Sequence, residues 1–263
     1  SLVDRGICPL STMTFGSLFA GIGGIDLGLE RAGMECQWQV EIDPYCRKVL
    51  AKHWPDTERF ADVKAVGKHN LGSVDLIAGG FPCQDVSIAG KRAGIQEGTR
   101  SGLWFEFHRI ICELRPRYVF VENVPGILVD GMGRVLGDLA ASGYDAEWQV
   151  LSAADVGAPH LRRRVWIVAH ALHGRPSVRG NGEDLSDLDG KLQAPKSRRD
   201  IQQSGLGDER GVERGHWKIE PDVGRVVTRI SNGMDRLKAL GNAVVPQCAE
   251  WIGRQILKHR EGT

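Results

Sequence analysis

The sequence predicts an α/β protein with a mostly parallel sheet, and three observations support this fold class. Short apolar segments alternate with amphipathic segments of helical period along the first 170 residues. Glycines and prolines separate many of these segments. Acidic or thiol side chains follow several apolar segments at their carboxyl ends, where proteins of this class bind ligands.

Each element is justified by its local pattern. Pro44 suits the first turn of a helix because its φ is fixed, and Pro116 ends the helix before it. Gly33 and Gly143 lie where two helical patterns stop. In order, we expect a strand, glycine turn and helix in 13–33, a strand in 36–43, a helix in 44–54, a strand in 73–81, a helix in 102–116, a strand in 117–126, a helix in 133–144, and strands in 145–153 and 164–170.

The alternation stops after residue 170. Residues 171–216 are rich in Gly, Ser, Asp and Arg without a clear period, which is typical of a disordered insertion or of a small lobe built from loops. Order resumes in 235–260, where we expect a loop at 240–242 and then a terminal amphipathic helix.

Composition narrows the functional classes. Of 263 residues, 41% are hydrophobic and 25% charged, which is ordinary for a soluble globular protein, and there is neither a membrane-length apolar run nor a signal-peptide pattern. The net charge of +1 does not by itself indicate a nucleic-acid partner, so any DNA-binding charge must be local. The six cysteines form no C-x-x-C pair, which disfavours a zinc site and predicts reduced thiols and no metal.

Cys83 has unusual surroundings for a packing residue. It lies in the stretch GGFPCQDVS, directly after the apolar run of 74–80. A thiol in a strand interior would be core, whereas a thiol at a strand's carboxyl end stands where ligands bind. We therefore interpret Cys83 as a chemical group.

The first glycine turn, FAGIGG (19–24), favours a ligand at the start of a helix. The dinucleotide fingerprint G-x-G-x-x-G is not met because its third glycine falls on Asp26, which argues against a nicotinamide or flavin cofactor. Glu41 ends the next strand, where an acid can accept hydrogen bonds from a ribose, so an adenosine compound is favoured.

Two further stretches carry candidate catalytic groups. Glu122 follows the apolar run of 117–121 and should stand beside Cys83 as a partly buried acid. In PHLRRR (159–164), a strand register would point Arg162 and Arg164 to one face and Arg163 to the other. Two guanidinium groups on one face suit a carbonyl oxygen or phosphates.

These motifs give the chain its resemblance to a family. FAGIGG, VEID, GGFPCQ, ENV, PHLRRR and GNAVVP occur in this order, and together they resemble the DNA (cytosine-5)-methyltransferases of the compact bacterial and phage type. The resemblance covers most of the chain from Phe15 to the terminal helix, apart from 171–216. It implies a Rossmann-like domain that uses S-adenosyl-L-methionine, a small target-recognition lobe, and methyl transfer to C5 of a flipped-out cytosine in a specific DNA sequence through a covalent Cys83–C6 intermediate.

The resemblance also implies residue roles. Cys83 corresponds to the nucleophile, Glu122 to the acid, and Arg162 and Arg164 to the two arginines that assist them. The positions that match the cofactor pocket are Phe19, Gly21, Gly24, Glu41, Asp62, Pro82, Leu103 and Asn242. The small and basic residues of 84–102 suggest a loop that closes over DNA, with contacts from Gln84, Ser87, Lys91, Arg92 and Arg100.

Two departures from the family pattern concern the arginine motif and the lobe. His160 replaces the glutamine that usually precedes the two arginines. The arginine- and glutamate-containing motif between the lobe and GNAVVP is replaced by residues 221–236, so the architecture of the lobe is open.

The expected organisation follows from the resemblance. Residues 1–12 are an N-terminal extension or a cloning remnant, 13–170 the catalytic and cofactor-binding domain, 171–220 the recognition lobe, and 221–263 a segment that returns to the catalytic domain. We expect a monomer acting on double-stranded DNA in the cytoplasm of a bacterial or phage-infected cell, with a cognate restriction endonuclease acting separately where one exists. An RNA (tRNA) cytosine-5 methyltransferase and a non-catalytic DNA-binding regulator are the alternatives.

Overall fold

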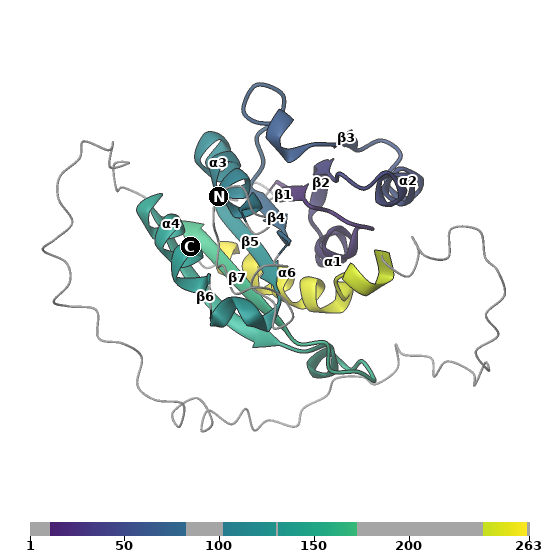
Figure 1. Cartoon of the computed structure of the whole chain (residues 1–263), viewed down its shortest axis with the longest axis vertical. Coiled ribbons are helices and arrows are strands. Elements are labelled where there is room, and N and C mark those ends of the chain that lie inside the picture. Colours follow the sequence, from purple (N-terminus) through teal and green to yellow (C-terminus); the bar gives the residue numbers. More distant parts are fainter. Residues whose placement is uncertain (1–10, 83–101, 130, 173–238, 262–263) are drawn as a thin grey trace, which may run out of the picture.

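Seven strands form one twisted sheet in the computed structural model, which describes residues 11–82, 102–129, 131–172 and 239–261. The strand order is β3-β2-β1-β4-β5-β7-β6, and only β7 runs against its neighbours (Figure 1). The strands are β1 (Thr14–Leu18), β2 (Glu35–Val40), β3 (Glu58–Phe60), β4 (Leu76–Gly79), β5 (Tyr118–Asn123), β6 (Tyr144–Leu151) and β7 (Arg164–Ala171). The predicted α/β class with a mostly parallel sheet is confirmed.

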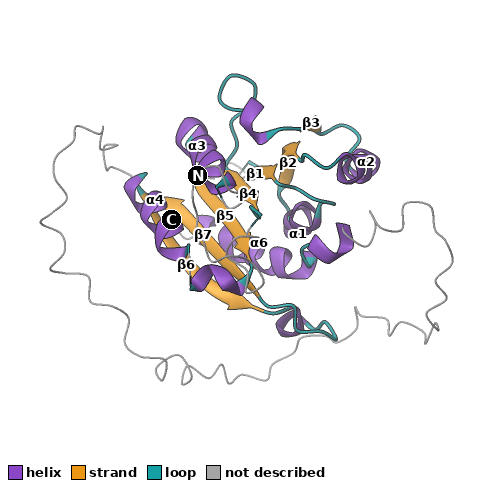
Figure 2. Cartoon of the chain, in the orientation of Figure 1, coloured by secondary structure: helices purple, strands orange, loops and turns teal. Residues whose placement is uncertain are grey.

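Helices cover both faces of this sheet (Figure 2). They are α1 (Gly24–Ala32), α2 (Pro44–His53), α3 (Leu103–Leu114), α4 (Met132–Ala141) and α6 (Pro246–Glu261), with the short 3-10 helices η1 (Val63–Ala65), η2 (Pro125–Leu128) and η3 (Ala153–Val156). Helices α3 and α4 lie on one face, and α1 and α6 lie side by side on the other (Figure 1). The terminal helix therefore returns to the first helix of the chain.

Local chemistry explains where the helices begin and end. Helix α1 ends at Gly33, whose φ of 103° suits glycine alone, and the Gly33 N–H bonds back to the carbonyl of Glu30. The Asp43 carboxylate caps α2 by accepting from the N–H groups of Tyr45 and Cys46, while Pro44 occupies the first helical turn. These ends agree with the boundaries that the sequence predicts.

The core has two parts, one on each face of the sheet. The larger contains Trp38, Trp104 and Phe107 among its buried side chains and lies under α3 and α4. The other lies under α1 and α6 and includes Phe15 and Leu29. Burial of this apolar surface fixes the sheet between its helices, so the strand ends form a rigid edge.

Three expectations were wrong or incomplete. The sequence did not indicate β3, a three-residue strand without a periodic pattern. Residues 240–242 are helical rather than a loop. Arg162 lies before β7 with a φ of 23°, so the strand register expected for Arg162 and Arg164 does not apply.

The structure describes residues 171 and 172 of the expected recognition lobe, and residues 173–220 lie outside the described residues. Within the described part of the chain, no helix has the length and apolar character needed to cross a bilayer.

Candidate active site

The carboxyl ends of four parallel strands meet at one edge of the sheet. Leu18 of β1 is in register with Val40 of β2 and with Gly79 of β4, and Gly79 is in register with Val121 of β5. The residues that follow these positions, including Glu41 and Glu122, therefore lie along the same edge although they are far apart in the sequence. This edge is the ligand-binding edge of an open α/β sheet.

Glu122 and Arg164 form a buried ion pair at this edge. Arg164 Nε donates to Glu122 Oε1 at 2.8 Å, and only 12% of the Glu122 side chain and 20% of the Arg164 side chain are exposed. Burial raises the pKa of the Glu122 carboxyl, while the charges of Arg164 and Arg162 oppose that shift. The carboxyl is thus held closer to its protonated form than a surface glutamate, beside a permanent positive charge.

The segment that leads to Cys83 is fixed to the end of β5. The amide of Asn123 donates to the carbonyl of Phe81 at 3.2 Å, and its side-chain oxygen accepts from the N–H of Val124 at 2.8 Å. A Cβ at Gly80 would lie 2.6 Å from Glu122 Oε2, so only glycine lets the chain pass so close to the carboxylate. The chain therefore passes directly against Glu122 at Gly80, three residues before Cys83.

Arg162 has a different environment from the one predicted. Its Nη2 donates to the carbonyls of Gly241 at 3.0 Å and of Ala243 at 2.5 Å. Burial and the nearby charge of Arg164 lower the pKa of the Arg162 guanidinium, while Glu122 opposes that shift. Arg162 thus ties the segment that carries Asn242 to this edge, whereas Arg164 alone pairs directly with Glu122.

The glycine turn after β1 is joined to the end of β2 by Glu41. Gly21 N–H donates to Glu41 Oε2 at 2.8 Å, and Asp43 N–H donates to Oε1 at 2.7 Å. Gly21 has a φ of 57°, and a Cβ there would meet open space. Beside Glu41, the side chain of Ile42 is 71% exposed, an apolar group that the sequence analysis did not single out.

Asp26 supports this turn from beneath. It lies fully buried in the first turn of α1, where it accepts from Ser17 Oγ at 3.0 Å and from Gln39 Nε2 at 2.8 Å. Burial raises the pKa of Asp26 to about 6. The residue that breaks the dinucleotide fingerprint therefore fixes α1 to β1 and β2.

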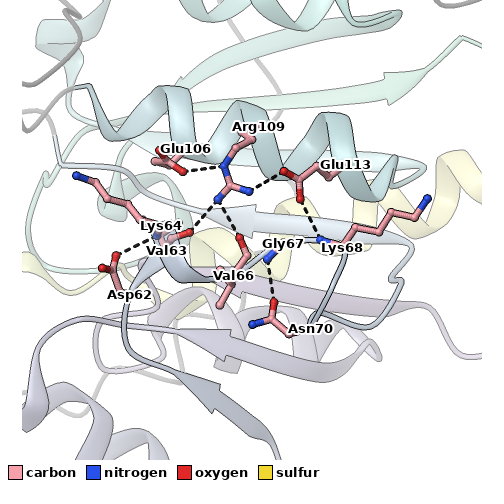
Figure 3. A network of polar contacts seen from close by, with 10 residues as sticks. All are labelled: Asp62, Val63, Lys64, Val66, Gly67, Lys68, Asn70, Glu106, Arg109 and Glu113. Carbon is pink, nitrogen blue, oxygen red and sulfur yellow. Dashed lines mark hydrogen bonds and ion pairs between the residues drawn. The ribbon is translucent and has the colours of Figure 1, made fainter.

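Asp62 lies on a loop held by Arg109, a residue that the sequence analysis missed (Figure 3). Asp62 Oδ1 accepts from the N–H of Lys64 at 2.9 Å and caps η1. Arg109 on α3 donates to the carbonyls of Val63 at 3.1 Å and Val66 at 2.8 Å.

The same guanidinium is oriented by two acids of its own helix. Arg109 Nε pairs with Glu106 at 2.8 Å and its Nη1 pairs with Glu113 at 2.7 Å, while Glu113 also accepts from the N–H of Lys68. A helix arginine with acids at i−3 and i+4 is typical of a solvated surface. The structural function of Arg109 is therefore evident only from its hydrogen bonds to the carbonyls of Val63 and Val66. It joins α3 to the Asp62 loop.

Phe19, Gly24 and Leu103 are further predicted cofactor residues in the described part of the chain. The Phe19 ring stacks on Phe107 with centroids 6.3 Å apart, and Leu103 begins α3. A Cβ at Gly24 would lie 2.5 Å from the carbonyl oxygen of Val244, so the start of α1 lies against the segment after Asn242.

Six predicted site residues lie outside the described residues: Cys83, Gln84, Ser87, Lys91, Arg92 and Arg100. In the described ranges no cluster of three or more His, Cys, Asp or Glu side chains is arranged to hold a metal ion. A cavity of about 270 Å³ lies away from this edge, between α6 and strands β5 to β7, and none of the predicted site residues lines it.

A family model described as "C-5 cytosine-specific DNA methylase" matches residues 13–205. The chain belongs to this family. The matched region contains the glycine turn, Cys83, Glu122 and both arginines, and ends before the GNAVVP segment. The described edge therefore belongs to a DNA methylase fold.

Curated relatives agree with the family match. "Type II methyltransferase M2.BsuMI" of Bacillus subtilis is 35% identical over 184 residues, which cover 66% of this chain and 46% of that protein. "Type II methyltransferase M.HhaI" of Haemophilus parahaemolyticus is 33% identical over 163 residues, covering 60% and 49%. The chain thus spans about half the length of the curated relatives it matches.

Solved structures show the same fold. A putative DNA modification methyltransferase of an Escherichia coli prophage superposes with a TM-score of 0.51 and 28% identity, over 61% of this chain and 47% of that one. Spodoptera frugiperda DNMT2 superposes with a TM-score of 0.52 and 21% identity, over 65% of this chain and 54% of that one. At this identity the likeness supports the fold alone. The sheet is therefore that of a Rossmann-like methyltransferase.

Proposed function

We propose that this chain transfers a methyl group from S-adenosyl-L-methionine to C5 of a cytosine flipped out of a specific DNA sequence, through a covalent bond between Cys83 and C6. The observation that carries the proposal is the buried Glu122–Arg164 pair, which stands beside the segment leading to Cys83. An acid and a guanidinium that act together with a thiol would match the charge changes of nucleophilic addition to a cytosine ring.

S-adenosyl-L-methionine fits the residues around the glycine turn. Each carboxylate oxygen of Glu41 accepts one backbone N–H and has a further lone pair for a ribose hydroxyl. Ile42 offers exposed apolar surface for the face of an adenine ring, and Gly21 leaves open space at the turn. When bound, the cofactor supplies an electrophilic methyl group on a sulfonium sulfur. Asp62 and Asn242 complete the proposed pocket.

Addition of the thiol is the first chemical step. The Cys83 thiolate forms a bond to C6, and the C5=C6 π electrons shift so that the ring becomes an enamine. Glu122, whose raised pKa favours the carboxylic acid, donates a proton to N3. The Arg164 guanidinium carries five N–H donors and can bind the O2 carbonyl while it retains Glu122.

Methyl transfer and elimination complete the reaction. Bound S-adenosyl-L-methionine would supply the methyl group to C5 of this enamine, and the residues around Glu41 would hold it for that purpose. A base then removes the C5 proton, the C6–S bond breaks, Cys83 returns as the thiolate, and the N3 proton returns to Glu122. Because C5 and C6 are inaccessible inside a duplex, the cytosine must leave the base stack, and the basic residues Lys91, Arg92 and Arg100 would contact its phosphates.

Arg162 takes a supporting role in this proposal. Its bonds to the Gly241 and Ala243 carbonyls hold the Asn242 segment against the cofactor side of the site. Residues 171–220 would select the DNA sequence. The relatives are named type II methyltransferases, so the chain would act in DNA modification of that type. This proposal does not depend on an accompanying restriction endonuclease.

The direct test is product analysis. The chain is incubated with methyl-labelled S-adenosyl-L-methionine and either duplex DNA or tRNA, and the nucleosides are analysed by mass spectrometry. We expect labelled 5-methyl-2′-deoxycytidine from DNA and none from tRNA. Label in tRNA alone would support the RNA alternative, and label in neither would favour a non-catalytic regulator. Bisulfite sequencing of modified DNA then gives the recognised sequence.

A further inference from the structure

A second thiol lies in a polar cluster far from the proposed active site. His108 and Cys112 are one turn apart on α3, so their side chains share one helix face. His108 Nε2 lies 3.6 Å from Cys112 Sγ, and Ser142 Oγ at the end of α4 lies 3.4 Å from the same sulfur. The imidazole and the hydroxyl are themselves 2.7 Å apart. Three reactive side chains from two helices thus converge.

The imidazole is oriented to stabilise a thiolate. His108 Nε2 also lies 3.0 Å from the carbonyl oxygen of Asp138, which can only accept, so a proton on Nε2 satisfies this arrangement. The buried Trp104 ring stacks on His108 with centroids 5.9 Å apart and an interplanar angle of 20°. The ring is therefore held with its N–H side toward the carbonyl, the hydroxyl and the sulfur.

The charges around the sulfur favour its ionised form. The hydrogen bond with His108 lowers the pKa of the Cys112 thiol, with smaller help from Ser142 and Arg115 and against the effect of burial. The pKa of His108 is raised in return, chiefly by its hydrogen bond with Cys112, and Asp138 of α4 adds to this shift. Tyr144, at the start of β6, also faces this cluster, and Arg115 lies over its ring at 5.1 Å.

Among the four cysteines in the described ranges, Cys112 is exposed, whereas Cys36, Cys46 and Cys248 are buried. Burial raises the pKa of Cys36 and raises that of Cys248 to about 11, so their thiols stay protonated and inaccessible. Cys112 combines access with a stabilised thiolate, which are the two requirements for a reactive cysteine. The proposed methyl transfer uses none of these groups, since Cys112 lies about 14 Å along the helix from Leu103.

We propose that Cys112, His108 and Ser142 form a thiol–disulfide exchange site on the outer face of α3, where Cys112 accepts a low-molecular-weight disulfide. The Cys112 thiolate attacks one sulfur of a disulfide R–S–S–R, a new S–S bond forms, and the original S–S bond breaks. The leaving thiolate R–S⁻ takes a proton from the His108 imidazolium or from water. The product is a mixed disulfide that a thiol reductant reverses.

Oxidised glutathione is the probe that tests the site. The reduced chain is exposed to it between pH 6 and 9, remaining thiols are blocked, and modification is measured by mass spectrometry of tryptic peptides. Cys112 falls in the peptide 110–117 and Cys83 in 69–91, so the two are read separately. We expect the Cys112 rate to rise with a pH midpoint below the ordinary thiol value of about 8.5. Cys248 should remain unmodified while the protein is folded.

Two variants separate a positioned cluster from simple exposure. His108→Gln should shift the midpoint upward and lower the rate at pH 6.5 about severalfold, because the thiolate fraction falls as the thiol pKa rises, although a more basic thiolate is also more nucleophilic. Ser142→Ala retains the imidazole and should reduce the rate less than His108→Gln does. It also provides a test if the His108→Gln variant fails to fold. An ordinary midpoint in the wild type, or equal rates in the wild type and a folded variant, would overturn the proposal.

Discussion

Arg164 Nε lies 2.8 Å from Glu122 Oε1; Arg164 begins β7, and Glu122 is the penultimate residue of the neighbouring antiparallel strand β5. Because β7 runs against β5, its first residue faces the end of β5, and an arginine there meets the acid at the ligand-binding edge. Removing a buried partner would leave an uncompensated charge, so the two groups should be tested separately.

Glu122→Gln should lower the rate of methylation by roughly 10²- to 10⁴-fold, because the amide preserves shape but cannot donate a carboxylic proton. Burial raises the pKa of Glu122, so the acid form extends to higher pH than for an ordinary glutamate, and proton donation is lost as pH rises through that raised pKa. Single-turnover rates between pH 5 and 9 would show this descending limb in the wild type. Unchanged rates in the variant would remove Glu122 from the chemistry.

Arg162→Lys and Arg164→Lys should have different kinetic effects. Lysine keeps the charge but loses the planar fork, so Arg162→Lys should release the Gly241 and Ala243 carbonyls and raise KM for S-adenosyl-L-methionine. Arg164→Lys should instead lower kcat, because it disturbs the group paired with Glu122. Steady-state kinetics with each substrate varied distinguishes the two. An identical kcat loss in both variants would assign both arginines to the reacting ring.

Arg109→Met should weaken cofactor binding without abolishing catalysis. The variant loses two charge-assisted bonds to the Val63 and Val66 carbonyls, and each bond contributes about 1.5–3 kcal/mol when it is formed by a charged group. We expect the Kd for S-adenosyl-L-methionine to rise about tenfold or more, measured by calorimetry, with kcat retained at saturating cofactor.

Arg254→Met is the matched control for this change. Arg254 forms an i,i+4 pair with Glu250 on α6 and its side chain is 57% exposed, so its removal should leave the Kd unchanged. If both variants bind the cofactor like the wild type, the Asp62 loop does not depend on Arg109.

Asp26→Asn should change how stability depends on pH. Folding raises the pKa of Asp26 from 3.8 to about 6, so its contribution is fully present below pH 3.8 and is lost as pH rises through about 6. A shift of this size corresponds to about 3 kcal/mol. Relative to the wild type, the variant should therefore gain about that free energy of unfolding between pH 3 and pH 7.

Urea unfolding of both proteins across this pH range measures the difference, in which the titration of other groups cancels. Ser17, Gln39 and Cys36 surround the carboxyl, and Cys36 remains a neutral thiol throughout the range because burial raises its pKa. A constant difference between the two proteins would mean that Asp26 titrates alike in the folded and unfolded states.

The helices and strands could be predicted from local sequence patterns. Once the strands are taken as parallel, their carboxyl ends are expected at one edge of the sheet. Periodicity marks strands and helices, and the parallel order of strands brings Glu41 and Glu122 to one edge. Strand β3 escaped prediction because three residues are too few to show a period, and it forms only by pairing with β2.

Tertiary contacts decided the features that the sequence could not predict. Arg162 leaves the strand register because the chain turns at a positive φ to reach the carbonyls of 241 and 243, which lie far along the sequence. In the sequence, Arg109 has the pattern of a solvated helix residue, and its hydrogen bonds to the η1 loop are visible only in the structure. The exposure of Ile42 beside Glu41, on which its proposed contact with adenine depends, is likewise visible only in the structure.

The covalent role of Cys83 is most directly tested with duplex DNA that carries 5-fluorocytosine at the recognised position. Fluorine cannot leave C5 as a proton does, so after methyl transfer the enzyme should stay bonded to C6. Mass spectrometry of the trapped complex should place the adduct on Cys83 in the wild type and in Cys248→Ser, whose thiol is buried with a pKa of about 11. Cys83→Ser should form no adduct although it binds the cofactor. An adduct on another residue, or methylation without any adduct, would contradict the proposed mechanism.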